Sequence, residues 1–106
     1  MTDAFTRAVP LLERDVVATL GEGYRQTVRD AAASMIDSEL PRYVDSLVQR
    51  VQQEFHDLFI DTTWPACSRH RRHPLWYNED GWWWCEKDRV AVCKLGDLST
   101  LPRSIE

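Results

Sequence analysis

Apolar residues recur at steps of three and four along roughly the first sixty positions, which is the spacing of one face of an α-helix. Three such stripes follow one another along the chain. The first has Phe5, Val9, Leu12, Val16 and Leu20; the second Tyr24, Val28, Ala31, Ala32, Met35 and Ile36; the third Leu40, Val44, Leu47, Val51, Phe55 and Leu58. This part of the sequence predicts a helical hairpin or a three-helix unit.

Glycine and proline mark the expected ends of these helices. Gly21 and Gly23 end the first one. We expect its regular part to begin at Pro10, because proline is tolerated in the first turn of a helix but not in its interior. The segment 37–41 permits either a break, in which Ser38 caps a new helix near the proline that ends this segment, or a kink in one long helix. We favour the break.

The third stripe comes close to the seam of a coiled coil, because its steps are four, three, four, four and three. It is therefore suited to packing against the second helix or against another copy of the chain. We expect the contact within the chain. Self-association or a protein partner bound through the helical region is the alternative use of this stripe.

The composition changes at residues 61–65, so we divide the chain into a helical region, 1–62, and a second module, 63–106. In this module Leu75–Asn78 and Trp82–Cys85 flank a three-residue loop that ends in glycine, which is typical of a β-hairpin. A further run, Arg89–Leu95, predicts a third strand. The expected fold class is α+β, with the helices followed by a small zinc-stabilised antiparallel hairpin or meander.

The predicted strand register decides which side chains meet. Pairing Asn78 with Trp82 places Leu75 opposite Cys85. Pairing Cys85 with Arg89 across the second turn places Cys93 roughly 13 Å along the sheet from Cys85. One face then carries three tryptophans, and we expect the helical region to cover it, the alternative being a surface for a partner. These residues are Trp76, Trp82 and Trp84.

The candidate chemistry lies at the base of this hairpin. Cys67 and His70 have a Cys-x2-His spacing, which suits two ligands of one tetrahedral zinc ion, and the register returns Cys85 to their neighbourhood. We expect His73 to be the fourth ligand, with Asp88 as the alternative, because imidazole is the commoner zinc ligand beside thiolates. Cys93 is too far away in this register and is expected to be a buried thiol.

The stretch from Trp64 to Leu95 resembles a zinc ribbon, in which one metal-binding turn precedes a hairpin and a second follows it. The resemblance implies a structural Zn2+ ion. It departs from the family pattern at the second turn, where Cys85 and Asp88 occupy the positions of a Cys-x2-Cys pair. The departure places the fourth ligand and the strand register in question.

Charge and cysteine content narrow the classes of function. Of the formal charge of −4, the helical region carries the excess of acid, so it is a poor surface for nucleic acid. Three cysteines, an odd number, do not suit a disulfide framework. The N-terminus lacks the pattern of a secretion signal and no stretch is long enough to span a membrane, so we expect a cytoplasmic protein.

These features predict a small non-enzymatic zinc protein that acts as a protein-interaction or regulatory module. One alternative is a nucleic-acid-binding regulator that uses a loop with Arg69, Arg71 and Arg72. A second alternative is a zinc-dependent hydrolase with an open metal position. Against catalysis, the chain has no His-x-Glu or His-Glu-x2-His arrangement and no glycine-rich phosphate loop.

Overall fold

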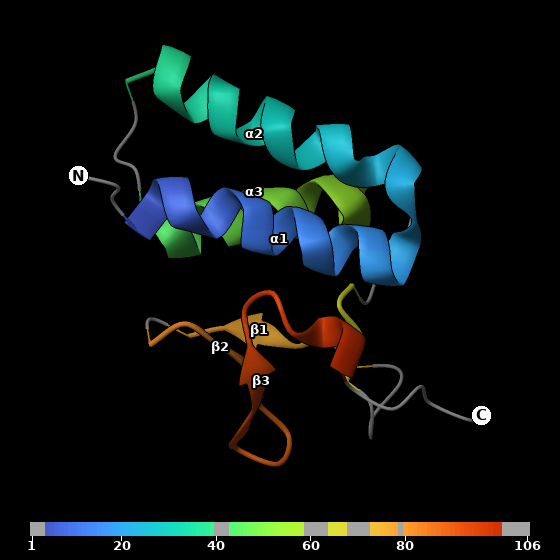
Figure 1. Ribbon diagram of the computed structural model, residues 1–106. Coiled ribbons are helices and arrows are strands. Elements are labelled where there is room, and N and C mark those ends of the chain that lie inside the picture. Colours follow the sequence, from blue (N-terminus) through green and yellow to red (C-terminus); the bar gives the residue numbers. More distant parts are fainter. Residues whose placement is uncertain (1–3, 40–42, 59–63, 68–72, 79, 101–106) are drawn as a thin grey trace.

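A computed structural model describes residues 4–39, 43–58, 64–67, 73–78 and 80–100. In this part of the chain, three α-helices are followed by one antiparallel sheet of three strands in the order β1-β2-β3 (Figure 1). The expected α+β class is thereby confirmed. The elements are α1, Ala4–Leu20; α2, Arg25–Asp37; α3, Val44–Asp57; β1, Trp76–Tyr77; β2, Trp82–Cys85; and β3, Val90–Lys94.

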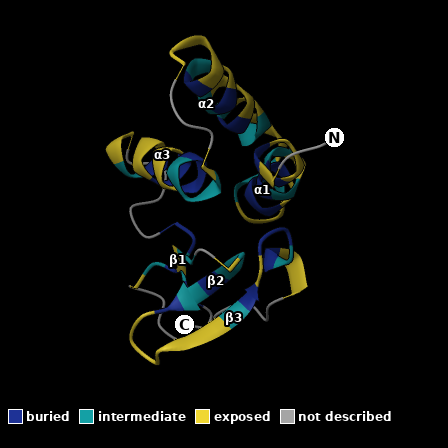
Figure 2. Ribbon diagram, turned by 90° about the vertical axis from the view of Figure 1, so that its left-hand side faces the viewer, coloured by how far each residue is buried: buried dark blue, intermediate teal, exposed yellow. Residues whose placement is uncertain are grey.

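The elements stack in layers. Helices α1 and α3 lie side by side, α2 packs on them from one side, and the sheet lies against their other side (Figures 1 and 2). The buried residues of the helices and of the sheet belong to one hydrophobic cluster. The sheet therefore shares its core with the helical region.

The periodic stripes identify most of the helical core. Buried members are Phe5, Leu12, Val16, Val28, Ala32, Met35, Leu47, Val51 and Phe55. Two predicted members are exposed instead: Ile36 by 44% and Leu58 by 57%. Ile36 is turned about 100° around the helix axis from Met35, which takes the inward position. Leu58 follows the last residue of α3, and Leu40 lies outside the described residues.

Two predictions of helix ends were wrong. Helix α1 begins at Ala4 and contains Pro10 in its interior. Phe5 and Ala8, each only 3% exposed, bury the turns before the proline, and this packing overrides its local preference. The break between α2 and α3 is confirmed, but Ser38 ends α2 rather than capping α3, and its N–H donates to the Ser34 carbonyl at 3.0 Å.

The register of the first two strands is as predicted, because Trp76 pairs with Trp84 and Tyr77 with Trp83. The second turn was predicted wrongly. Cys85 pairs with Val90, so the turn has four residues, and a register shift between Trp83 and Trp84 places Cys93 opposite Trp83. A shift of this kind is a β-bulge, which cannot be predicted from the alternation of apolar and polar side chains.

The predicted cover of the sheet was also wrong. Trp83, together with Leu75 and Cys85 on the same face, is buried against the helices, whereas Trp76 on the other face is 41% exposed. Trp83 contacts Trp64, and Trp64 contacts Phe55 of α3, in edge-to-face geometry with ring centroids 5.8 and 5.1 Å apart. The helices therefore cover the face opposite the three tryptophans.

Candidate metal centre

The thiols of Cys67 and Cys85 meet beneath the helices. The segment 64–67 runs antiparallel to residues 73–75: the Cys67 N–H donates to the His73 carbonyl at 3.0 Å, and Ala66 forms a bridge with Pro74. Cys85 is the last residue of β2, the second strand of the hairpin. The two sulfur atoms come within 3.7 Å of each other although the residues are 18 positions apart.

The distance between the two sulfur atoms indicates which kinds of bond they can form. A disulfide requires its sulfur atoms to be about 2.0 Å apart, so both cysteines are free. Two sulfur atoms bound to one tetrahedral zinc ion at about 2.3 Å lie about 3.8 Å from each other. A separation of 3.7 Å therefore suits two ligands of one such ion, and it is also the distance of the thiol–thiol hydrogen bond from Cys67 to Cys85.

The turn after Cys85 supplies a donor to its sulfur. The Asp88 N–H points at the Cys85 Sγ at 3.4 Å, and Arg89 closes the turn in the left-handed region with φ 56°. Burial raises the pKa of Cys85, whereas the Asp88 N–H acts in the opposite direction, because it stabilises a thiolate. The Asp88 N–H only partly offsets the effect of burial, so the pKa of Cys85 remains raised and the metal-free site favours the neutral thiol.

The structure describes only some of the remaining predicted ligands. His70 lies outside the described residues, as do Arg69, Arg71 and Arg72. His73 and Asp88 are described and lie in exposed positions. Within the described ranges, no group of three or more histidine, cysteine or acidic side chains is arranged to hold a metal. Cys93 is buried on β3, as expected.

Two buried polar residues that join the helices to the C-terminal module were missed in the sequence. Asp15 of α1, which is fully buried, accepts hydrogen bonds from Trp83 Nε1 and from the N–H groups of Gly96 and Leu98, at 2.8, 2.7 and 2.9 Å. Burial raises the pKa of Asp15, and these three donors and Arg14 oppose the rise. The sequence did contain an indication that Asp15 is buried, because Asp15 lies three residues after Leu12 and so shares the apolar face of the helix.

Gln52 of α3 has the same kind of position on the third stripe. It is 2% exposed, and its Nε2 donates to the carbonyls of Trp64 and Leu75 at 3.2 and 2.9 Å. These two carbonyls belong to the paired segments on either side of Cys67. Gln52 therefore holds together the backbone that carries the thiol.

Comparisons with protein-family models, with curated proteins and with solved structures give no match. No helix in the described part of the chain is long and apolar enough to cross a membrane.

Proposed function

We propose that this protein is a small non-enzymatic interaction module whose sheet is stabilised by one structural zinc ion. The proposed ligands are Cys67, His70, His73 and Cys85, with Asp88 as the alternative to His73. The observation that carries the proposal is the 3.7 Å distance between the two sulfur atoms. Cys67 and His70 enter as a pair because the sequence spaces them by two residues.

The shortness of the strands supports a structural role for the ion. The strands have only two, four and five residues. Hairpins of this size are marginal in water unless packing or a metal holds them. A zinc ion at Cys67 and Cys85 would join the segment before β1 to the end of β2, and so add a cross-link beside the packing of Trp83.

The test is metal analysis of the protein purified without chelator. We expect about one zinc per chain in the wild type, and loss of that zinc in Cys67→Ser, His70→Ala and Cys85→Ser. Of His73→Ala and Asp88→Ala, only the variant that removes the fourth ligand should weaken zinc binding. Cys93→Ser is the matched control, because it removes a buried thiol from the same sheet and should keep the metal.

A wild-type protein that holds no zinc after this preparation would refute the metal centre. Removal of zinc by a chelator should also increase amide hydrogen exchange in β2 and β3 more than in α2, because α2 packs away from the sheet. Equal effects on both layers would show that the ion does not act locally on the sheet.

A further inference from the structure

Cys67 and Cys85 lie close enough to each other to form a disulfide bond with little movement. Their sulfur atoms are 3.7 Å apart, and each residue is only 2% exposed. Because a disulfide bond is about 2.0 Å long, each sulfur has to move by less than about 1 Å to form it. Both residues belong to hydrogen-bonded segments, Cys67 through the His73 carbonyl and Cys85 through its pairing with Val90. The fold therefore holds the two thiols in contact before any bond joins them.

The third cysteine is placed differently. Cys93 pairs with Trp83, so it lies on the neighbouring strand and two residues, roughly 7 Å, along the sheet from Cys85. With about 4.8 Å between strands, the Cα atoms of Cys85 and Cys93 are farther apart than the limit of about 7 Å for a disulfide. Burial also raises the pKa of Cys93 to about 12, so this thiol stays protonated and reacts slowly. The geometry thus selects one pair among the three cysteines.

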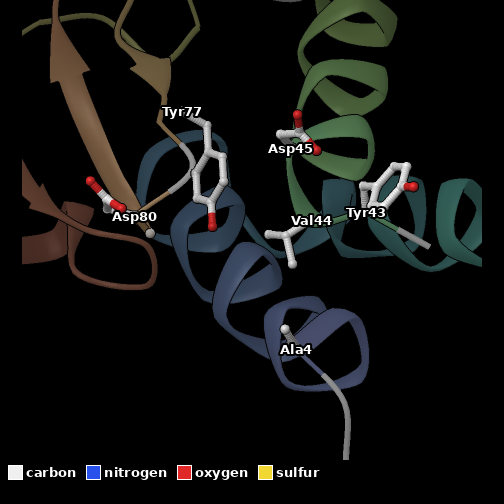
Figure 3. A pocket seen from close by; sticks show the side chains of 7 residues that line it. Ala4, Tyr43, Val44, Asp45, Tyr77 and Asp80 are labelled. Atoms are coloured by element: carbon white, nitrogen blue, oxygen red, sulfur yellow. The ribbon is translucent and has the colours of Figure 1, made fainter. Parts of the chain in front are cut away.

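The burial of the pair limits which oxidants can reach it. A cavity of about 550 Å³ opens between the start of α3 and the turn between β1 and β2, with Asp45 and Tyr77 on opposite sides of the opening (Figure 3). Neither Cys67 nor Cys85 is among the described residues that line this cavity. An oxidant that reaches two residues of 2% exposure has to be small. Hydrogen peroxide meets this requirement, because it is little larger than water.

We propose that Cys67 and Cys85 are a redox-active pair, which hydrogen peroxide converts into a disulfide. One thiol attacks a peroxide oxygen, which gives a sulfenic acid and one molecule of water. The second thiol then displaces the hydroxyl group as a second molecule of water, and the S–S bond forms. In total, the two thiols lose two electrons and two protons, and one peroxide is reduced to two molecules of water. A dithiol reductant reverses the reaction by thiol–disulfide exchange.

The same bond removes two ligands from the proposed metal centre. Two zinc-bound thiolates, one molecule of peroxide and two protons give the disulfide, a free Zn2+ ion and two molecules of water. A disulfide sulfur carries no negative charge, so the bond and the ion exclude each other at this site. The release of zinc rests on the proposed function, whereas the disulfide itself needs no metal.

The experiment treats the protein, purified without chelator, with a slight excess of hydrogen peroxide and then alkylates the thiols that remain. Mass spectrometry counts these thiols and maps the linked peptides, and a colour indicator measures released zinc. We expect loss of two of the three thiols, one peptide pair joined through Cys67 and Cys85, and an alkylated Cys93. Dithiothreitol should restore all three thiols.

The unfolded chain provides a control with a different expected product. Without the fold, the shorter loop closes more readily, and Cys85 and Cys93 are 8 positions apart (93 − 85), whereas Cys67 and Cys85 are 18 apart. In urea we therefore expect the bond from Cys85 to Cys93 about threefold more often than the bond from Cys67 to Cys85. A reversal of this preference in the folded protein would show that the fold selects the pair.

Two variants separate the roles of the thiols. Cys93→Ser is the matched control, because it removes a buried thiol from the same sheet and should form the same disulfide as the wild type. Cys67→Ser should form no disulfide under native conditions, because Cys93 is out of reach of Cys85. A folded wild type that keeps all three thiols, or that links Cys85 to Cys93, would overturn the inference.

The metal proposal fails separately, because zinc content is measured before peroxide is added. A protein that holds no zinc and still joins Cys67 to Cys85 refutes only the metal centre. A protein that holds one zinc and keeps both of these thiols reduced in peroxide refutes only the redox pair.

Discussion

The helical layer and the sheet layer are held in different ways. Between the helices, the buried contacts are almost all apolar, and the main polar contact is Glu13 with Arg25 and Arg29, at 3.4 and 2.9 Å. The sheet is attached through a few buried polar groups, above all Asp15 and Gln52. The helical layer therefore depends almost entirely on apolar contacts, whereas the sheet shares that apolar core and depends in addition on a few buried hydrogen bonds.

The largest test of this difference is Asp15→Ala. It leaves three buried donors of the C-terminal region without an acceptor, so we expect a loss of about 3–5 kcal/mol in the free energy of unfolding. Urea denaturation measures it. Asp97→Ala is the control: it removes a carboxylate paired with Arg14 on the exposed surface, at 3.2 Å, and should cost less than about 1 kcal/mol. Similar losses in both variants would contradict the special role of Asp15.

A second test adds a side-chain atom where α1 and the end of the sheet come close together. Gly96 has φ 97°, and a Cβ there would lie 2.8 Å from Leu11 Cδ2 and 3.2 Å from Leu11 Cβ. Gly96→Ala should therefore cost about 2–3 kcal/mol by thermal or urea unfolding. Gly23→Ala serves as the control, because a Cβ at that position meets nothing within 4 Å. A neutral Gly96→Ala would show that α1 and this turn are loosely joined.

A third test uses pH and Cys93. Burial, with smaller contributions from Asp15 and Asp97, raises the pKa of Cys93 from 9.0 to about 12. The unfolded chain releases this proton above pH 9.0 and the folded chain does not, so the stabilisation is complete below pH 9.0 and is lost between pH 9 and 12. At pH 10 the wild type should have lost about 1 kcal/mol relative to Cys93→Ala. Parallel stability profiles of the two proteins would contradict burial of the thiol.

The smallest expected effect belongs to Gln52→Leu. The substitution removes two hydrogen bonds to backbone carbonyls, but it also removes an Oε1 that has no partner among the described residues. We therefore expect a loss of only about 1 kcal/mol. Gln53→Leu, at an exposed neighbouring position, should change the free energy of unfolding by less than about 0.5 kcal/mol. Equal losses of unfolding free energy in both variants would show that Gln52 does not help to hold the sheet against the helices.

Sequence periodicity was sufficient for the helical layer because the burial of Leu12, Val28 and Leu47 repeats at the helical period. It was sufficient for the first hairpin because a three-residue loop fixes its register. The second turn could not be derived, since the register shift between Trp83 and Trp84 cannot be read from the alternation of side chains. Which face of the sheet is buried could not be derived either, because both faces carry tryptophan.

The candidate site was predictable to the extent that local spacing determines it. The register of the first hairpin returned Cys85 toward Cys67, and the two sulfur atoms do lie together. The sequence did not reveal which buried polar groups join this module to the helices. Asp15 and Gln52 act on segments distant in the chain, and such partners leave only the faint signal of a polar residue on an apolar stripe.

The hydrogen bonds from Gly96 and Leu98 to Asp15 span 81 and 83 residues of the chain. On a ribosome, α1 is therefore synthesised well before the residues that donate these hydrogen bonds to Asp15. During that interval the Asp15 carboxylate must remain hydrated, and the face of α1 that carries it cannot be permanently buried. A nascent chain of this protein should therefore complete its core only after Gly96 and Leu98 have emerged, and chain cleavage between the layers should leave neither half with a native core.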